Sequence, residues 1–101
     1  MKVQATPLHF AISANKLRHA RVLLKNGAKP NRKDIEGNTP MHHAVAQRSL
    51  PLVRLLDEFD ADATIINIDD FSAIDIAIME DIKDVKVFLC SRQRYKDVEL
   101  R

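Results

Sequence analysis

Cysteine and long apolar runs are scarce in this sequence. Its 101 residues contain one cysteine, Cys90, so no disulfide can form within the chain. Aspartate or arginine interrupts every apolar stretch well short of the roughly 18 residues that a membrane-spanning helix needs. Residues 1–5 show no apolar signal region. We therefore expect an intracellular protein without a membrane span, in the cytoplasm, with the nucleus as the alternative.

Catalytic motifs are also missing. The sequence has two glycines and no Gly-rich phosphate loop, G-x-S-x-G elbow or Cys/His couple. Paired acids occur at 57–58, 69–70 and 80–81, and such pairs can perform acid–base chemistry or bind a cation. Without an accompanying motif, a solvated acidic edge is the better interpretation. We expect no enzyme, no catalytic residue and no cofactor.

The four histidines do not form a metal-binding pattern. His42 and His43 are adjacent, so on a helix their side chains point roughly 100° apart and cannot hold one ion as ligands four positions apart do. His19 lies between basic residues and is expected in solvent. The sequence therefore predicts no metal site.

What the chain does contain is an internal repeat. The hexapeptide Thr6-Pro7-Leu8-His9-Phe10-Ala11 returns 33 residues later as Thr39-Pro40-Met41-His42-His43-Ala44, and again, eroded, as Ser72-Ala73-Ile74-Asp75-Ile76-Ala77. A second column of the same period holds Leu23, Leu56 and Leu89. A repeat of this length indicates one supersecondary unit stacked on copies of itself.

The T-P-L-H-x-A pattern at period 33 resembles the ankyrin-repeat family over nearly the whole chain. The resemblance implies a mostly α solenoid of helix–turn–helix pairs with short β-hairpin fingers. It divides a single domain, residues 1–101, into repeat 1 (about 1–33), repeat 2 (about 34–66) and repeat 3 (about 67–101), the last a divergent C-terminal cap. It also implies that His9 and His42 bond to backbone and tie neighbouring units together.

The first helix of each unit has a clear start signal. Thr6 and Thr39 are good N-caps, and each precedes a proline, which is favoured at the first helical position. We expect helices over residues 7–14 and 40–47. The third copy lacks both proline and histidine, so its helix should begin more loosely.

Polar residues separate the two helices of each unit. Asn15, Ser49 and Asp81 are each expected to cap a second helix. A turn that needs a positive φ should follow each second helix, at Gly27 and, less comfortably, at Asp60.

Partner contacts are expected where ankyrin repeats generally make them, at the finger tips and the inner face of the first helices. These positions are Lys33, Ile35, Glu36, Asn38 and Gln47 in repeat 2, and Ile68, Asp69, Phe71, Met79 and Glu80 in repeat 3. Large apolar side chains on a projecting turn are candidate anchors, above all Phe71. The alternative is that the isoleucines of repeat 3 only cover the neighbouring hairpin.

Charge is distributed unevenly along the chain. The three units carry balances of +8, −4 and −2, which together give the net charge of +2. In a solenoid this order is also spatial, so the first end is positive and could steer an acidic partner. The residues that we call the basic patch are Arg18, Arg21, Lys25, Lys29 and Arg32.

These features favour a non-catalytic scaffold or adaptor that binds another protein in a hetero-complex. One alternative is an obligate structural subunit of a larger intracellular complex. A second is a binder of nucleic acid or acidic lipid through the basic patch. Nucleic acid is disfavoured because the basic residues are not interleaved with aromatics and no nucleic-acid-binding motif is present.

Overall fold

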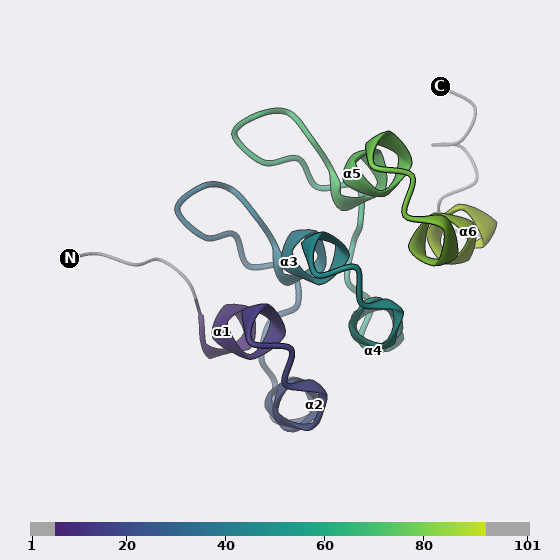
Figure 1. Ribbon diagram of the computed structural model, residues 1–101. Coiled ribbons are helices and arrows are strands. Elements are labelled where there is room, and N and C mark those ends of the chain that lie inside the picture. Colours follow the sequence, from purple (N-terminus) through teal and green to yellow (C-terminus); the bar gives the residue numbers. More distant parts are fainter. Residues whose placement is uncertain (1–5, 93–101) are drawn as a thin grey trace.

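Three stacked helix pairs make up the molecule. The computed structural model describes residues 6–92, and these contain six helices and no strand. The helices are α1 (Pro7–Ser13), α2 (Leu17–Lys25), α3 (Pro40–Ala46), α4 (Leu50–Glu58), α5 (Ala73–Met79) and α6 (Lys83–Ser91). Helix α3 packs between α1 and α5, and α4 packs between α2 and α6 (Figure 1). The predicted mostly α solenoid is confirmed.

The first helix of every pair begins with the same capping box. Thr39 Oγ1 accepts a hydrogen bond from the His42 amide, while the backbone amide of Thr39 donates to His42 Nδ1 at 3.0 Å. The predicted loose start of the third helix is wrong. Ser72 caps α5 in the same way, because a carboxylate oxygen of Asp75 accepts from the Ser72 amide at 2.9 Å.

The turn between the helices of each pair contains a left-handed residue at intervals of 33 positions. Asn15 (φ 59°), Arg48 (φ 57°) and Asp81 (φ 51°) occupy it. The caps predicted at Asn15 and Asp81 are therefore wrong, since these residues make the turn before the cap. Ser49 does cap α4, and its hydroxyl accepts from the Leu52 amide.

A second left-handed column follows the second helices. Gly27 has φ 96° and Asp60 has φ 65°, as predicted from their place in the repeat. Asparagine and aspartate tolerate this region better than most residues, which explains how the second copy dispenses with glycine.

The hydrophobic core lies where the helices of each pair pack on one another and on the neighbouring pair. Its fully covered side chains include Leu8, Ile12, Met41, Val45, Leu52, Leu55, Leu56, Ile74, Val85 and Leu89. Asp57 also lies inside, 5% exposed, where Arg92 pairs with it at 3.0 Å. The solvated position predicted for that acid is wrong. Among the helices of the described residues, none is long and apolar enough to cross a membrane.

Two histidines tie the pairs together, as the resemblance implied. His9 Nε2 donates to the Asn38 carbonyl at 3.0 Å, and His42 Nε2 donates to the Phe71 carbonyl at 2.8 Å. The tautomer follows from the cap, because Nδ1 accepts from the threonine amide and leaves the proton on Nε2. Each imidazole thus caps its own helix and holds the next loop.

Candidate functional site

Two loops project from the stack between its helix pairs (Figure 1). We call residues 34–38 and 67–71 the finger pair. In the first finger, Asp34 Oδ1 accepts from the amides of Glu36 and Asn38, both at 2.9 Å. The Asp34 amide donates to the Asn38 carbonyl at 2.9 Å, which closes the loop. The backbone of this finger is therefore internally bonded.

The second finger repeats this arrangement with asparagine in place of aspartate. Asn67 Oδ1 accepts from the amides of Asp69 (2.9 Å) and Phe71 (3.1 Å), and the Asn67 amide donates to the Phe71 carbonyl (3.0 Å). The structure gives both fingers as tight turns, without the strands of the predicted hairpins. Asp and Asn recurring 33 residues apart is the sequence signal that could have found these turns.

The two fingers are bonded to each other. The Ile68 amide donates to the Glu36 carbonyl at 3.1 Å, and the Asn67 side chain donates to the Asn38 side chain at 2.9 Å. Gly37 makes this approach possible, because a Cβ there would lie 3.0 Å from the Ile68 nitrogen. The finger pair is thus one ordered ledge rather than two separate loops.

Large apolar side chains stand out from this ledge. Ile35 is 62% exposed and Ile68 is 70% exposed, and they occupy equivalent places in the two fingers. Phe71, at 38%, is covered for more than half of its surface. Met79, at the end of α5, is also exposed. Ile35 and Ile68 are therefore the most open of the three anchors predicted from the sequence.

The remaining predicted contact residues differ in their surroundings. Those in solvent are Lys33, Glu36, Gln47, Asp69 and Glu80, whereas Asn38 is half-buried and bonded to the second finger. Gln47 donates to the Ser13 carbonyl at 2.6 Å, and Glu80 pairs with Arg48 at 3.2 Å. Asn38, Gln47 and Glu80 therefore already serve contacts between helix pairs.

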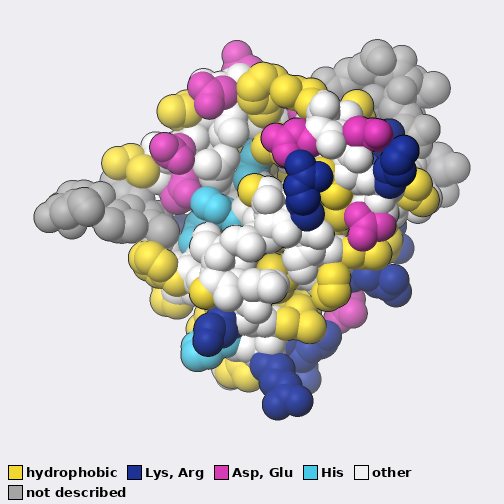
Figure 2. All heavy atoms as spheres, viewed as in Figure 1, with side chains coloured by type: hydrophobic (Ala, Val, Ile, Leu, Met, Phe, Trp, Pro, Cys, Tyr) yellow, Lys and Arg dark blue, Asp and Glu magenta, His cyan; other side chains and the backbone are white. Residues whose placement is uncertain are grey.

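Acidic side chains gather over the fingers, whereas lysine and arginine lie elsewhere on the surface, some of them beside other acids (Figure 2). Residues 34–38 and 67–71 hold four carboxylates and no lysine or arginine, and residues 55–82 hold nine carboxylates and no lysine or arginine. Figure 2 shows magenta and yellow side chains together at the upper left, over the fingers, and dark blue side chains gathered at the bottom of the view. The finger pair is both acidic and apolar.

The basic patch lies on α2 and the loop that follows it. Arg18, Lys25, Lys29 and Arg32 are exposed, and Arg21 reaches α4, where its guanidinium lies 3.4 Å from a carboxylate oxygen of Glu58. Most of the patch therefore lies on the first helix pair, and Arg32 lies two residues before the first finger.

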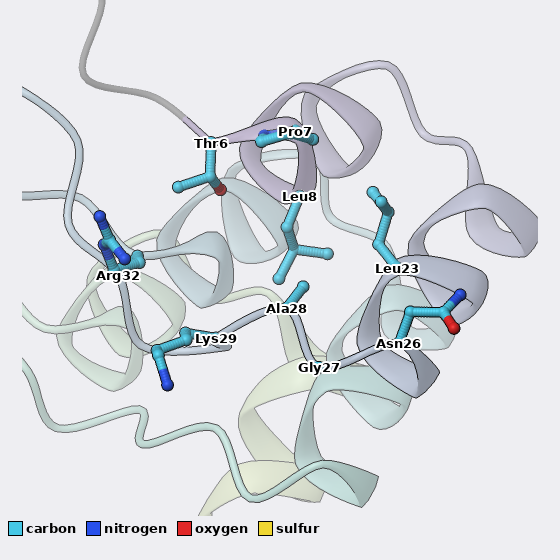
Figure 3. Close-up of a pocket in the computed structure, with 9 residues that line it drawn as sticks. All are labelled: Thr6, Pro7, Leu8, Leu23, Asn26, Gly27, Ala28, Lys29 and Arg32. Carbon is cyan, nitrogen blue, oxygen red and sulfur yellow. The ribbon is translucent and has the colours of Figure 1, made fainter.

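A hollow of about 450 Å³ lies beside two residues of the basic patch, Lys29 and Arg32 (Figure 3). Its apolar lining includes Leu8 and Leu23, which point between α1 and α2. Leu23 is half-buried here, whereas Leu56, its equivalent in the second pair, is fully covered. The hollow therefore marks the leading face of the stack, where the column is open.

One group of side chains has a composition suited to metal binding. Ligand atoms of His9, Asp34 and His43 lie within 4.8 Å of one another. His43 Nε2 is 2.9 Å from Asp34 Oδ2, and both nitrogens of His9 are used, by the Thr6 cap and by the Asn38 carbonyl. A metal would have to break the bond between helix pairs, so this geometry supports a structural role. The Asp34–His43 pair carries no sequence signal that we recognise.

Burial controls the protonation of this region. Desolvation lowers the pKa of His9 and of His42, and this outweighs the backbone hydrogen bonds that would raise it. Burial would raise the pKa of Asp34. The hydrogen bonds from His43 and from two backbone amides nevertheless bring it below its ordinary value. The lowered pKa values favour the neutral form of His9 and His42, which is the form that their hydrogen bonds to an amide and a carbonyl require.

Comparison with known proteins supports the reading of the repeats. A family model of ankyrin repeats, which occur in many copies, matches residues 8–56. The chain is 32% identical to an ankyrin repeat protein of fowlpox virus (strain NVSL) over 88% of this chain and 14% of that protein. It is 37% identical to Notch-regulated ankyrin repeat-containing protein B of Danio rerio over 64% of this chain and 59% of that one. NF-kappa-B inhibitor alpha of Rattus norvegicus is 43% identical over 55% of this chain and 18% of that protein. The chain thus spans less than two thirds of each relative.

Proposed function

Since the chain is an ankyrin-repeat protein, we propose that it is a non-catalytic scaffold or adaptor that binds another protein. The contacts lie on the finger pair and the concave face of the first helices. We further propose that residues 1–101 act as a single domain of three repeats, with the third as its C-terminal cap. The module works inside the cell as part of a hetero-complex.

The observation that carries this proposal is the pair of exposed isoleucines on an ordered ledge. Ile35 and Ile68 project from turns that are bonded internally and to each other. A surface already held in one conformation loses little entropy when a partner binds. Apolar side chains that become buried in the centre of an interface contribute most of its affinity.

Two further observations support a role without catalysis. The side chains that chemistry could use already serve the structure: His9 bonds the first helix pair to the loop before α3, and His43 bonds to Asp34 of the first finger. One relative supports this role by its name, which describes it as an inhibitor of NF-kappa-B. The basic patch fits this role as a steering surface for an acidic region of the partner.

Substitution of the anchors tests the proposal once a partner has been isolated with the intact chain. Ile35→Ala and Ile68→Ala should each weaken binding by ~1–3 kcal/mol and leave the melting temperature nearly unchanged. Phe71→Ala should also weaken binding but lower the melting temperature, because more than half of its side chain is covered. Val87→Ala, an equally exposed aliphatic site on α6, should change neither. Titration calorimetry and thermal unfolding give the two readouts. A large loss of stability with binding intact would refute a surface role.

An obligate structural subunit is distinguished by mass action. If the chain folded only within a complex, its unfolding midpoint would rise with the partner's concentration and be poorly defined for the isolated chain. The proposed adaptor instead unfolds cooperatively alone, at a midpoint independent of its own concentration.

A further inference from the structure

We infer that the finger pair binds a partner segment that is both basic and aliphatic, with lysine or arginine beside its apolar residues. This inference rests on the proposed function and adds the chemistry of the bound segment. It concerns the finger pair alone and does not involve the basic patch.

The exposed finger carboxylates form no ion pair among the described residues, although Lys33 directly precedes the first finger. Several acids elsewhere in the described chain are paired: Asp57 with Arg92, Glu58 with Arg21 and Glu80 with Arg48. Among the described carboxylates of the finger pair, only Asp34 lies within ion-pair distance of a basic side chain, with His43 Nε2 at 2.9 Å. Glu36, Asp69 and Asp70 face solvent. Their negative field is therefore directed outward.

Each finger presents an isoleucine followed by an acidic side chain. Ile35 precedes Glu36 in the first finger, and Ile68 precedes Asp69 in the second. The Ile68 amide bonds to the Glu36 carbonyl, so the two dipeptides lie side by side. The ledge thus alternates an exposed aliphatic group with a carboxylate, twice.

A ligand that matches the finger pair has to use both the isoleucines and the carboxylates. A metal cation would engage the carboxylates and leave the isoleucines in water. An acidic segment would set like charges against Glu36 and Asp69, at a cost in affinity. A segment with aliphatic and cationic side chains buries the isoleucines and neutralises the acids together, and it would bind more weakly as salt increases.

Selection from a random peptide library tests the inference directly. The probe is a phage-displayed library of 12-residue peptides, selected on the intact chain and counter-selected on the Ile35→Ser/Ile68→Ser variant. The expected survivors are enriched in lysine or arginine together with leucine, isoleucine, valine or phenylalanine. Synthetic copies, followed by fluorescence anisotropy, should bind the variant at least tenfold more weakly.

Charge substitution provides the second arm. Glu36→Lys/Asp69→Lys should weaken the selected peptides at least tenfold, and the isosteric Glu36→Gln/Asp69→Asn should weaken them less. Glu58→Lys/Asp84→Lys makes the same change in net charge outside the finger pair and should leave binding within twofold. Circular dichroism verifies that each variant is folded. If the lysine variant does not fold, the isosteric variant still shows whether the finger charges contribute to peptide binding.

The outcomes separate this inference from the proposed function. Survivors that are acidic or uncharged, or no survivors, overturn the inference, as does binding that is insensitive to the finger charges. If acidic peptides bind through the basic patch, protein binding stands and only the chemistry assigned to the finger pair falls. If an isolated partner binds the wild type and the Ile35→Ser/Ile68→Ser variant equally, the proposed interaction surface itself falls.

Discussion

At the scale of single residues, the third residue of each pair's first helix (His9, His42 or Asp75) completes the N-terminal cap, and the two histidines also bond to the next repeat. An imidazole there accepts from the cap amide with one nitrogen and donates to the next loop with the other. Asp75 stands at this position in α5 and performs the first task, with its carboxylate bonded to the Ser72 amide. The imidazole can do both because its second nitrogen donates, whereas a carboxylate has no proton to give to a carbonyl.

Removing a capping hydroxyl should therefore cost stability. Thr39 is fully buried, and its Oγ1 accepts from the His42 amide. We expect Thr39→Ala to lower the free energy of unfolding by ~1 kcal/mol, measured by urea denaturation. Thr39→Ser keeps the acceptor and should lose clearly less. Equal losses in the two variants would assign the effect to the methyl group instead of the cap.

The neutral histidines predict a pH dependence. The pKa values of His9 and His42 are lowered in the folded state, below their ordinary 6.5, mainly by burial. Below that pH the unfolded chain binds more protons than the folded one, so stability falls as pH falls from about 6.5 through the lowered values. Asp34, whose pKa is lowered from 3.8, should lose its contribution only at more acidic pH.

His9→Gln/His42→Gln tests this, because glutamine can complete a capping box but does not titrate. The urea midpoint of the wild type should decrease between pH 7 and pH 5. In the double variant this decrease should be much smaller, on a lower baseline. An unchanged slope would contradict the assignment of the pH dependence to these two residues.

At the scale of elements, the two glycines differ in how closely other backbone approaches them. Both glycines have positive φ, but a Cβ on Gly27 would meet nothing within 4 Å, while one on Gly37 would meet the backbone of the second finger. Gly27→Ala should cost only the backbone strain, about 1–2 kcal/mol. Gly37→Ala should lower the free energy of unfolding by more, as measured by urea denaturation. Equal losses would show that the second finger moves away from the added Cβ at little cost.

The elements also show what could be read from sequence. The starts of α1 and α3 were predictable because a cap is a local interaction within four residues, and both helices end one residue before the predicted limit. The caps expected at Asn15 and Asp81 failed because such residues favour a left-handed turn as readily as a cap. The bonds between fingers and the burial of Asp57 were beyond reach, since they depend on how one unit stacks on the next.

At the scale of the whole molecule, a residue's contribution to the free energy of unfolding depends on whether another helix pair packs against its own. Ile12 and Ile78 are the same residue type in the same column of the repeat. Ile12 is fully covered, because the second pair stacks on it, whereas Ile78, in the third pair, is 46% exposed. The stack therefore offers a matched comparison of one position with and without a following unit.

Truncating each isoleucine should reveal this difference. Ile12→Ala should destabilise the chain by ~2–5 kcal/mol, through lost burial and the cavity that remains. Ile78→Ala should cost about 1 kcal/mol or less, because much of its side chain is already in water. Chemical denaturation of the two variants measures the difference. Similar losses would mean that Ile78 makes contacts beyond those of the six helices.

The middle helix pair is packed on both sides, against α1 and α2 on one side and α5 and α6 on the other (Figure 1). Each outer pair has only one neighbouring pair among the described helices. In such a stack the backbone amides of the middle pair should be the best protected from hydrogen exchange. Local unfolding should begin in the outer pairs. The two fingers differ accordingly in their anchorage: the one leading into α3 belongs to the best-protected unit, and the other holds on to it.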